Sequence, residues 1–267
     1  MSTYLLAPPP SVLCSSPLFR MLLTGSIVLS LALSAVCSRT LNRVAADVIT
    51  KCVVPNTVAL TFDDGPYDFL NEVVDTLVSA GAKGTFFFNG DNWRCIYAEE
   101  SVKRVKYAFD HGFQIASHTW GHKHLNTLTR DEINSEMARA EDAIVKITGS
   151  LPAYTRTPYG EYNDLVRQVA ASRGQQLANW DFDSQDTLGA SVEKQKQLYD
   201  EAVSRHPDTI LSLQHEIYET SVREVLPYAI EKLQAAGYKL VTLAECLGDH
   251  PYFQTGPPSQ RDDSWHC

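Results

Sequence analysis

The stretch VALTFDDGPYD, residues 58–68, joins an apolar run to two adjacent carboxylates and a Gly-Pro turn. Its first five residues are typical of a short buried strand. Asp63 and Asp64 follow at the carboxyl end of that strand, where two ionised side chains repel each other. A surface turn explains the pair when it is taken alone. A bound cation is the other explanation, because it would relieve the repulsion, and the pair taken alone favours the turn.

The theme of an apolar run followed by an amphipathic stretch repeats along the chain after about residue 45. The predicted strands are Val58–Phe62, Gly84–Asn89, Gln114–Ser117, Ala153–Arg156, Gln176–Trp180, Thr209–Gln214 and Tyr238–Thr242. The predicted helices are Asp68–Ala80, Val102–His111, Arg130–Thr148, Tyr162–Arg173, Ser191–Arg205 and Val222–Ala236. Strands that alternate with helices pair in parallel through right-handed crossovers. We therefore expect an α/β fold, a distorted and incomplete (β/α) barrel with about seven parallel strands. An open doubly wound sheet is the alternative, and no Gly-rich phosphate loop supports it.

Composition limits the size of the core and the kind of partner. The chain has 267 residues, 44% of them hydrophobic, which suits one domain with a substantial core. Its net charge of -9 opposes binding to nucleic acid and to anionic membranes, because the phosphate groups would repel it. We expect no nucleic-acid partner, and a neutral or cationic substrate.

The N-terminal segment predicts export. Arg20 precedes an apolar run at residues 21–36 that ends in small residues, which is typical of a secretory signal. We expect a signal peptide at residues 1–38, with Met21 as an alternative start. The run is short for a membrane span, so a retained anchor is the less favoured reading. A secreted, extracellular or cell-wall associated monomer without stable membrane insertion is the resulting expectation.

The remaining boundaries follow from composition. We expect a linker at residues 39–50, a catalytic domain at 51–248 and a C-terminal tail at 249–267. The tail is rich in Pro, Gly and polar residues, and a disulfide is the only tie that we predict for it.

Four cysteines remain once the signal is removed: Cys52, Cys95, Cys246 and Cys267. An even count in a secreted chain predicts two disulfides, although three connectivities are open. We favour Cys52–Cys246, because these residues flank the first and last predicted strands and a closing barrel would bring them together. A buried free thiol is the alternative for Cys246.

Polar clusters stand at the carboxyl ends of several predicted strands, where parallel barrels place their active sites. In SHTWGH, residues 117–122, His118 and His122 are four positions apart, so a helical turn would turn both rings the same way. Such a pair alone is more often structural. Together with a carboxylate from the neighbouring strand end, it predicts an open catalytic metal site, with Zn²⁺ favoured and Co²⁺ an alternative. One Asp would bind the ion and the other would act as a base beside it. The residues alone do not assign these two roles.

Five segments in order resemble the motifs of the polysaccharide deacetylases, carbohydrate esterase family four. They are TFDDGP, SHTWGH, RTPYG, DSQD and LSLQHE, and the resemblance covers roughly residues 53–247. The surrounding segments TFFFNGDNWRCI and NWDFDSQD are most similar to fungal-type chitin deacetylases. The resemblance implies a distorted barrel and a metal-dependent hydrolase of N- or O-acetyl groups on glycans.

The resemblance also implies roles for individual residues. Asp63 would be the general base, and Asp64, His118 and His122 would hold the metal. Arg156 would pair with Asp63, which favours the ionised carboxylate.

The later motifs imply the other half of the site. The backbone N–H of Tyr159 would help to bind the oxyanion, while its ring lines the acetyl pocket with Leu213. His215 would be the general acid, and Asp186 would hold it in its cationic form.

Substrate preference is the least determined feature. Trp120 and Trp180 are candidate surfaces for stacking on sugar rings, although core packing is the alternative. Thr187 stands where the family usually has Trp, so we expect a more open acetyl pocket on that side. The resemblance implies conversion of chitin to chitosan and acetate. An O-acetyl esterase on acetylxylan and a non-catalytic glycan-binding protein are the alternatives.

Overall fold

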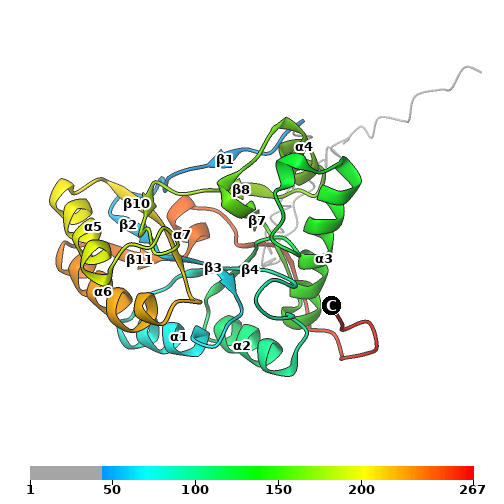
Figure 1. Ribbon diagram of the computed structural model, residues 1–267, viewed down its shortest axis with the longest axis horizontal. Coiled ribbons are helices and arrows are strands. Elements are labelled where there is room, and N and C mark those ends of the chain that lie inside the picture. The colour runs from blue at the N-terminus through cyan, green and yellow to red at the C-terminus, as the bar shows by residue number, and fades with distance from the viewer. Residues whose placement is uncertain (1–43) are drawn as a thin grey trace, which may run out of the picture. The chain divides into compact units, whose positions relative to one another are not determined.

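A computed structural model describes residues 44–267 of the chain, and the expected signal peptide lies outside this range. A ten-stranded sheet runs through the molecule in the order β1-β8-β7-β5-β4-β3-β10-β2-β11, with β9 also paired to β10 (Figure 1). Its strands are β1 (Val48–Ile49), β2 (Thr57–Ala59), β3 (Thr61–Gly65), β4 (Thr85–Phe88), β5 (Gln114–Ser117), β7 (Tyr154–Thr155), β8 (Gln176–Ala178), β9 (Phe182–Asp183), β10 (Thr209–His215) and β11 (Lys239–Val241). Every ladder in this sheet is parallel, so the predicted α/β class and incomplete barrel are confirmed.

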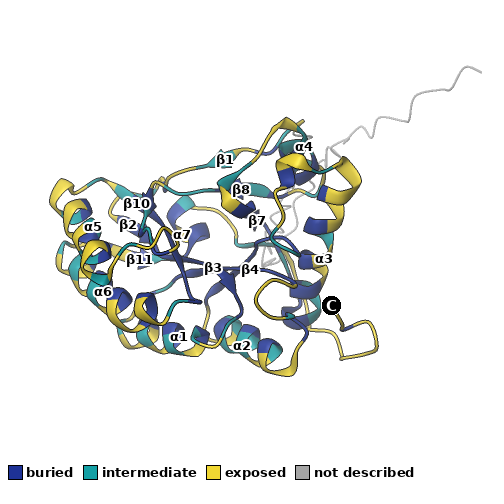
Figure 2. Cartoon of the chain, in the orientation of Figure 1, coloured by how far each residue is buried: buried dark blue, intermediate teal, exposed yellow. Residues whose placement is uncertain are grey.

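Helices cover the outside of the curled sheet (Figure 1). They are α1 (Leu70–Ser79), α2 (Glu99–Asp110), α3 (Arg130–Thr148), α4 (Asp164–Ser172), α5 (Val192–Arg205), α6 (Leu226–Ala235) and α7 (Leu243–Leu247). Their outer faces are exposed while the strands between them are buried (Figure 2). All four residues of β4, TFFF, are buried, because a parallel strand covered by helices has no solvent face. None of the helices in residues 44–267 is long and apolar enough to cross a membrane.

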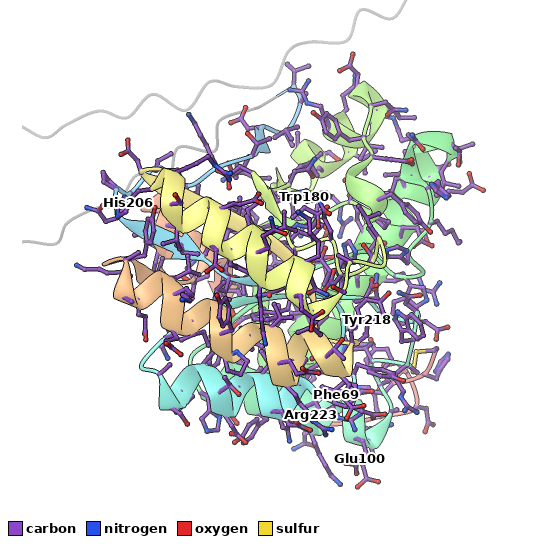
Figure 3. All side chains as sticks on the ribbon, turned by 60° about the vertical axis from the view of Figure 1, so that its left-hand side comes forward. Phe69, Glu100, Trp180, His206, Tyr218 and Arg223 are labelled. Atoms are coloured by element: carbon purple, nitrogen blue, oxygen red, sulfur yellow. A yellow bond between two sulfur atoms is a disulfide. The ribbon has the colours of Figure 1, made fainter. Side chains whose placement is uncertain are left out.

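Helix α3 shows why some bounds were predictable. Thr129 caps its first turn and forms a reciprocal capping box with Glu132, and Gly149 ends it in the left-handed conformation. The start of α6 was harder to predict, because a π-helical turn at Ser221–Val225 precedes it. Arg223 of this turn lies over the ring of Phe69, 5.3 Å from its centroid, and joins the starts of α6 and α1 (Figure 3).

Several short elements were missed. Val48 and Ile49 form β1 beside β8, so the linker expected at residues 39–50 is wrong for these two residues. The predicted first strand, Val58–Phe62, is divided into β2 and β3, which pair with successive parts of β10. Strands of two or three residues leave too little periodicity for a sequence pattern to detect.

The C-terminal segment is not a loose tail, which corrects the expectation for residues 249–267. Strand β12 (Tyr252–Thr255) pairs antiparallel with β6 (Ser150–Pro152). Farther along, Trp265 is buried and packs against Tyr97. The missed signal was this tryptophan, an aromatic anchor in an otherwise polar stretch.

Two disulfides close the structure. Cys52 is bonded to Cys246, as predicted from their positions beside the barrel strands. Cys95 is bonded to Cys267, which ties the end of the chain to the loop after β4.

Candidate functional site

The two adjacent aspartates reach the same cavity because β3 is irregular at its end. The pairing of β3 with β4 shifts between Asp63 and Gly65, and Asp64 has a φ of 72°. In a regular strand, neighbouring side chains point to opposite faces, whereas a bulge re-aims one of them. Both carboxylates are therefore buried and line one pocket. The bulge at Asp64 explains how two adjacent aspartates can belong to one site.

Asp64, His118 and His122 form a group that could hold a metal ion. Oδ1 of Asp64 lies 3.6 Å from Nε2 of His118 and 3.4 Å from Nε2 of His122. Ligand atoms around a tetrahedral Zn²⁺ are separated by about 3.3 Å for bonds of about 2.0 Å, so the spacing fits. Nδ1 of His118 lies 2.8 Å from the carbonyl oxygen of Arg156, which would accept its proton and leave Nε2 free for the metal.

The two histidines converge by a different route from the one predicted. Residues 118–122 form an irregular loop and not a helical turn, so that part of the prediction is wrong. Thr119 and His122 have φ values of 67° and 50°, and the two imidazole centroids lie 4.9 Å apart. Burial and the neighbouring His118 lower the pKa of His122 to about 4. A neutral imidazole at physiological pH is the form that binds metals.

Asp63 is held by a buried ion pair. Its Oδ1 accepts a hydrogen bond of 2.8 Å from Nη1 of Arg156, which is fully buried. Nη1 also donates to Oγ1 of Thr61, while Nε and Nη2 donate to the carbonyl oxygens of Ala178 and Asn179. Burial raises the pKa of Asp63, but the charges of Arg156 and the site histidines outweigh it and hold the pKa below its ordinary value. Asp63 is therefore ionised at neutral pH.

His215 is a buried cation held by a carboxylate, the reverse of the buried carboxylate Asp63 held by a cation. Its Nδ1 lies 2.8 Å from Oδ1 of Asp186, and its backbone N–H donates to Oδ2 of the same residue. Burial lowers the pKa of His215, but the hydrogen bond and charge of Asp186 outweigh it and raise the pKa to about 9. Asp63 and His215 are paired across β3 and β10, so an ionised carboxylate and a protonated imidazole stand on neighbouring strands.

A cavity of about 310 Å³ opens above these groups. Its lining comprises Asp63, Asp64, His118, His122, Thr157, Tyr159, Gly160, Trp180, Asp183, Thr187, Leu188, Leu213 and His215. The ring of Tyr159 stacks on His124 with centroids 4.0 Å apart and meets His122 edge to face. Thr187 and Leu188 are exposed at the rim, where the sequence predicted a more open wall.

Three predicted site residues do not line this cavity: Arg156 and Asp186 lie behind it, bonded to Asp63 and His215, and Trp120 lies apart from it. Trp120 is only 5% exposed and packs against Gly90, with Arg139 over its ring. A sugar needs an accessible ring face for stacking, so Trp120 belongs to the core packing and not to the substrate surface.

Other residues at the site were missed by the sequence reasoning. Asp183, Thr157 and Leu188 line the cavity, and Nδ2 of Asn92 lies 3.3 Å from Oδ1 of Asp64. Asp183 and Thr157 lie within the quoted motifs, so their position gave a signal. Asn92 comes from the loop that carries Cys95, and no pattern marked it.

Comparisons with known proteins agree on one family. A family model described as polysaccharide deacetylase matches residues 50–178. A chitin deacetylase from Pestalotiopsis sp. is 36% identical over 240 residues, which cover 88% of this chain and 76% of the relative. A chitin deacetylase from Colletotrichum lindemuthianum is 32% identical over 76% of this chain and 84% of the relative.

Solved structures give the same result. The structure of the chitin deacetylase from Colletotrichum lindemuthianum matches with a TM-score of 0.75 and 28% identity, covering 82% of this chain and 99% of that one. A family 4 carbohydrate esterase from Streptomyces lividans, in complex with acetate, matches with a TM-score of 0.63 and 28% identity, covering 78% of this chain and 100% of that one. With the motifs, the fold and these relatives in agreement, the chain belongs to the polysaccharide deacetylase family of hydrolases.

Proposed function

We propose that this protein is a secreted, Zn²⁺-dependent deacetylase of β-1,4-linked N-acetylglucosamine polymers, with chitin as its substrate. One observation carries the proposal: Asp64, His118 and His122 converge in the cavity that also holds Asp63 and His215. Two histidines and a carboxylate leave a coordination position open, as a catalytic zinc requires. A bound Zn²⁺ would polarise the acetamide carbonyl and lower the pKa of a water molecule beside it.

Asp63 acts as the general base in this proposal. Its lowered pKa keeps it ionised across the neutral range, so it can accept the proton of the attacking water. Arg156 holds one oxygen of Asp63 by a 2.8 Å hydrogen bond. The other oxygen, Oδ2, lies 3.7 Å from Nε2 of His118 and so faces the metal ligands, where the water would be.

Charge then develops on the acetyl oxygen and on the departing nitrogen. The Tyr159 N–H donates a hydrogen bond to the oxyanion, a contribution of about 2.7–4 kcal/mol for such donors in general. His215 gives its proton to the nitrogen as the C–N bond breaks, and acetate and a free amine result. Asp186 keeps His215 protonated until then.

The rest of the cavity receives the acetyl group and the sugar. Leu213, which is buried, and the ring of Tyr159 form its walls, and Trp180 offers an aromatic face to a sugar ring. The names of the relatives from Pestalotiopsis and Colletotrichum support chitin as the polymer. The exposed rim at Thr187 leaves room for an O-acetyl glycan such as acetylxylan, which is the second candidate substrate.

Secretion rests on the signal-like N-terminal segment and on the two disulfides, which form in oxidising compartments. We propose a monomer, because the site is assembled from one chain.

The test measures acetate released from chitin oligomers and from acetylxylan under the same conditions. We expect faster release from chitin oligomers, loss of activity after chelation and recovery with Zn²⁺. Faster release from acetylxylan would favour the esterase. Binding to chitin without any acetate release would instead indicate a glycan-binding protein.

A further inference from the structure

Glu216 is a buried acid beside the site that the proposed mechanism does not use. It follows His215 directly and is 0% exposed. Its Oε1 accepts a hydrogen bond of 3.1 Å from the backbone N–H of Tyr67. A Cβ added to Gly65 would overlap the same oxygen, so the carboxyl packs directly against the backbone of the turn that follows Asp64.

The charge state of Glu216 agrees with a hydrogen-bonding role. No hydrogen-bond partner within residues 44–267 contacts its second oxygen, Oε2. Arg104, the cation that acts on it, is engaged by Asp68 in an ion pair of 2.7 Å. Burial raises the pKa of Glu216 well above its ordinary value. A neutral carboxyl is thus compatible with the contact, and a Gln at this position would preserve the acceptor.

The contacts of Glu216 fall on the segment that directly follows Asp64. Gly65 immediately follows Asp64, and Tyr67 is three positions beyond it. The shift in pairing at Asp64 lies between Asp63 and Gly65, so it ends at the first residue that Glu216 contacts. The segment is therefore held by the residue that directly follows β10, the strand whose last residue is His215.

We propose that Glu216 is a positioning residue for Asp64: its carboxyl fixes the turn at Gly65–Tyr67 and so holds the Asp64 side chain where it can bind the metal. The proposal rests on the metal site of the proposed function. Outer contacts that orient a metal ligand affect affinity by about 10- to 100-fold when they are removed. Ordinary core filling would affect stability alone.

Two substitutions separate these possibilities. Glu216→Gln keeps the length and the acceptor for the Tyr67 N–H. Glu216→Met keeps the approximate volume but offers that N–H no acceptor oxygen, so the turn loses its fixed point. Ile210→Ala is the matched control, because it removes a buried side chain farther back on β10 and does not touch the turn.

The experiment measures the Kd of Zn²⁺ by competition titration on chelator-treated protein, together with Tm. We expect Glu216→Gln to bind Zn²⁺ within about threefold of the parent, and Glu216→Met to bind about 10- to 100-fold more weakly. Ile210→Ala should lower Tm while its folded fraction keeps the parent Kd. Equal zinc affinity in the parent and in Glu216→Met overturns the proposal, as does an equal loss in the Gln and Met variants.

If Glu216→Met does not fold, another variant can still test the proposal. Gly65→Ala approaches the same contact from the turn, since its methyl group displaces the Glu216 carboxyl, and it should also weaken zinc binding. Parent-like affinity in Gly65→Ala would then count against the proposal. The titration contains no glycan, so it tests the role of Glu216 independently of the substrate. A protein that releases no acetate from chitin but shows the expected zinc affinities would contradict the proposed function and still support the role of Glu216.

Discussion

Each side of the cavity holds a buried charged side chain beside a partner of opposite charge, and the two sides differ in sign. On β3, the buried Asp63 faces the guanidinium of Arg156, and on β10 the buried His215 faces the carboxylate of Asp186. Burial alone would neutralise both Asp63 and His215, because it disfavours the charged form of each. In each case the partner, together with the other opposite charges of the site, outweighs burial. The comparison teaches that an ionised carboxylate and a protonated imidazole coexist on adjacent strands because each has a buried counter-charge and the two also attract each other.

Removing the base should have the largest effect. Asp63→Asn keeps the shape of the side chain and eliminates the proton acceptor, so we expect kcat to fall by about 10²- to 10⁴-fold. Zinc affinity should stay close to that of the parent, because Asp64 and both histidines remain. Acetate release and zinc titration on the same preparation check this prediction. Parent-like turnover would exclude Asp63 as the base.

Removing the carboxylate that pairs with His215 should shift the pH profile of kcat/KM. Asp186→Asn removes the charge that favours protonated His215, so the alkaline limb of kcat/KM should move to lower pH by about one to two units. We expect this limb at or below about 9 in the parent, because the pKa of His215 is about 9 and a bound cation would lower it. A limb that stays in place would show that another group supplies the proton.

The interaction between Asp186 and His215 should also make the stability of the metal-free protein depend on pH. His215 has a folded pKa of about 9, above the ordinary value of 6.5, so its contribution is full below the ordinary value and is lost as pH rises through about 9. Tm measured between pH 6 and pH 10 should decline more in the parent than in Asp186→Asn. Parallel curves for the two proteins would contradict this prediction.

Weakening the base side without removing its charge should have a smaller effect. Arg156→Lys keeps a cation near Asp63 but loses the guanidinium hydrogen bonds to the carbonyl oxygens of Ala178 and Asn179. We expect a stability loss of about 1–3 kcal/mol and an acid limb at higher pH. Denaturant unfolding and the pH profile measure the two effects. An unshifted acid limb together with parent-like stability would mean that the fork geometry of Arg156 is dispensable.

The smallest effect is expected at the rim. Thr187→Trp adds an aromatic ring beside the exposed Leu188 and should narrow the entrance to the cavity. We expect KM to change by a few-fold with kcat nearly constant, since the charged groups are untouched. The ratio of rates on chitin oligomers and acetylxylan gives the readout. A large fall in kcat would show that the rim contacts the reacting groups.

The sequence predicted the parts of this fold that have strong local signals. The bounds predicted for α3, Arg130–Thr148, match the structure, in which Thr129, Glu132 and Gly149 mark its ends. Strand β4 was also predicted, and its three consecutive phenylalanines are a strong local signal for a buried strand. Strands β1 and β12 were missed, since each gains its stability from a distant partner and not from its own pattern.

In the site, too, features with a local sequence signal were predicted and features that depend on distant contacts were missed. The motifs identified the residues that meet in the cavity, but periodicity suggested a helical turn for His118 and His122 where the chain uses positive φ values. The bulge at Asp64 and the contact of Asn92 depend on neighbouring strands and loops, so no local pattern contains them. Trp120 lies within a motif, and only its burial shows that it faces the core.

The two cross-links have a practical consequence for proteolysis. Cys52–Cys246 and Cys95–Cys267 overlap, so one peptide-bond cut anywhere between Cys95 and Cys246 leaves two pieces that share both bridges. A nicked molecule would therefore run as a single species on a non-reducing gel and separate only after thiol treatment. Proteolytic damage would therefore go unnoticed by size alone, and the clipped protein would still have its two halves held together.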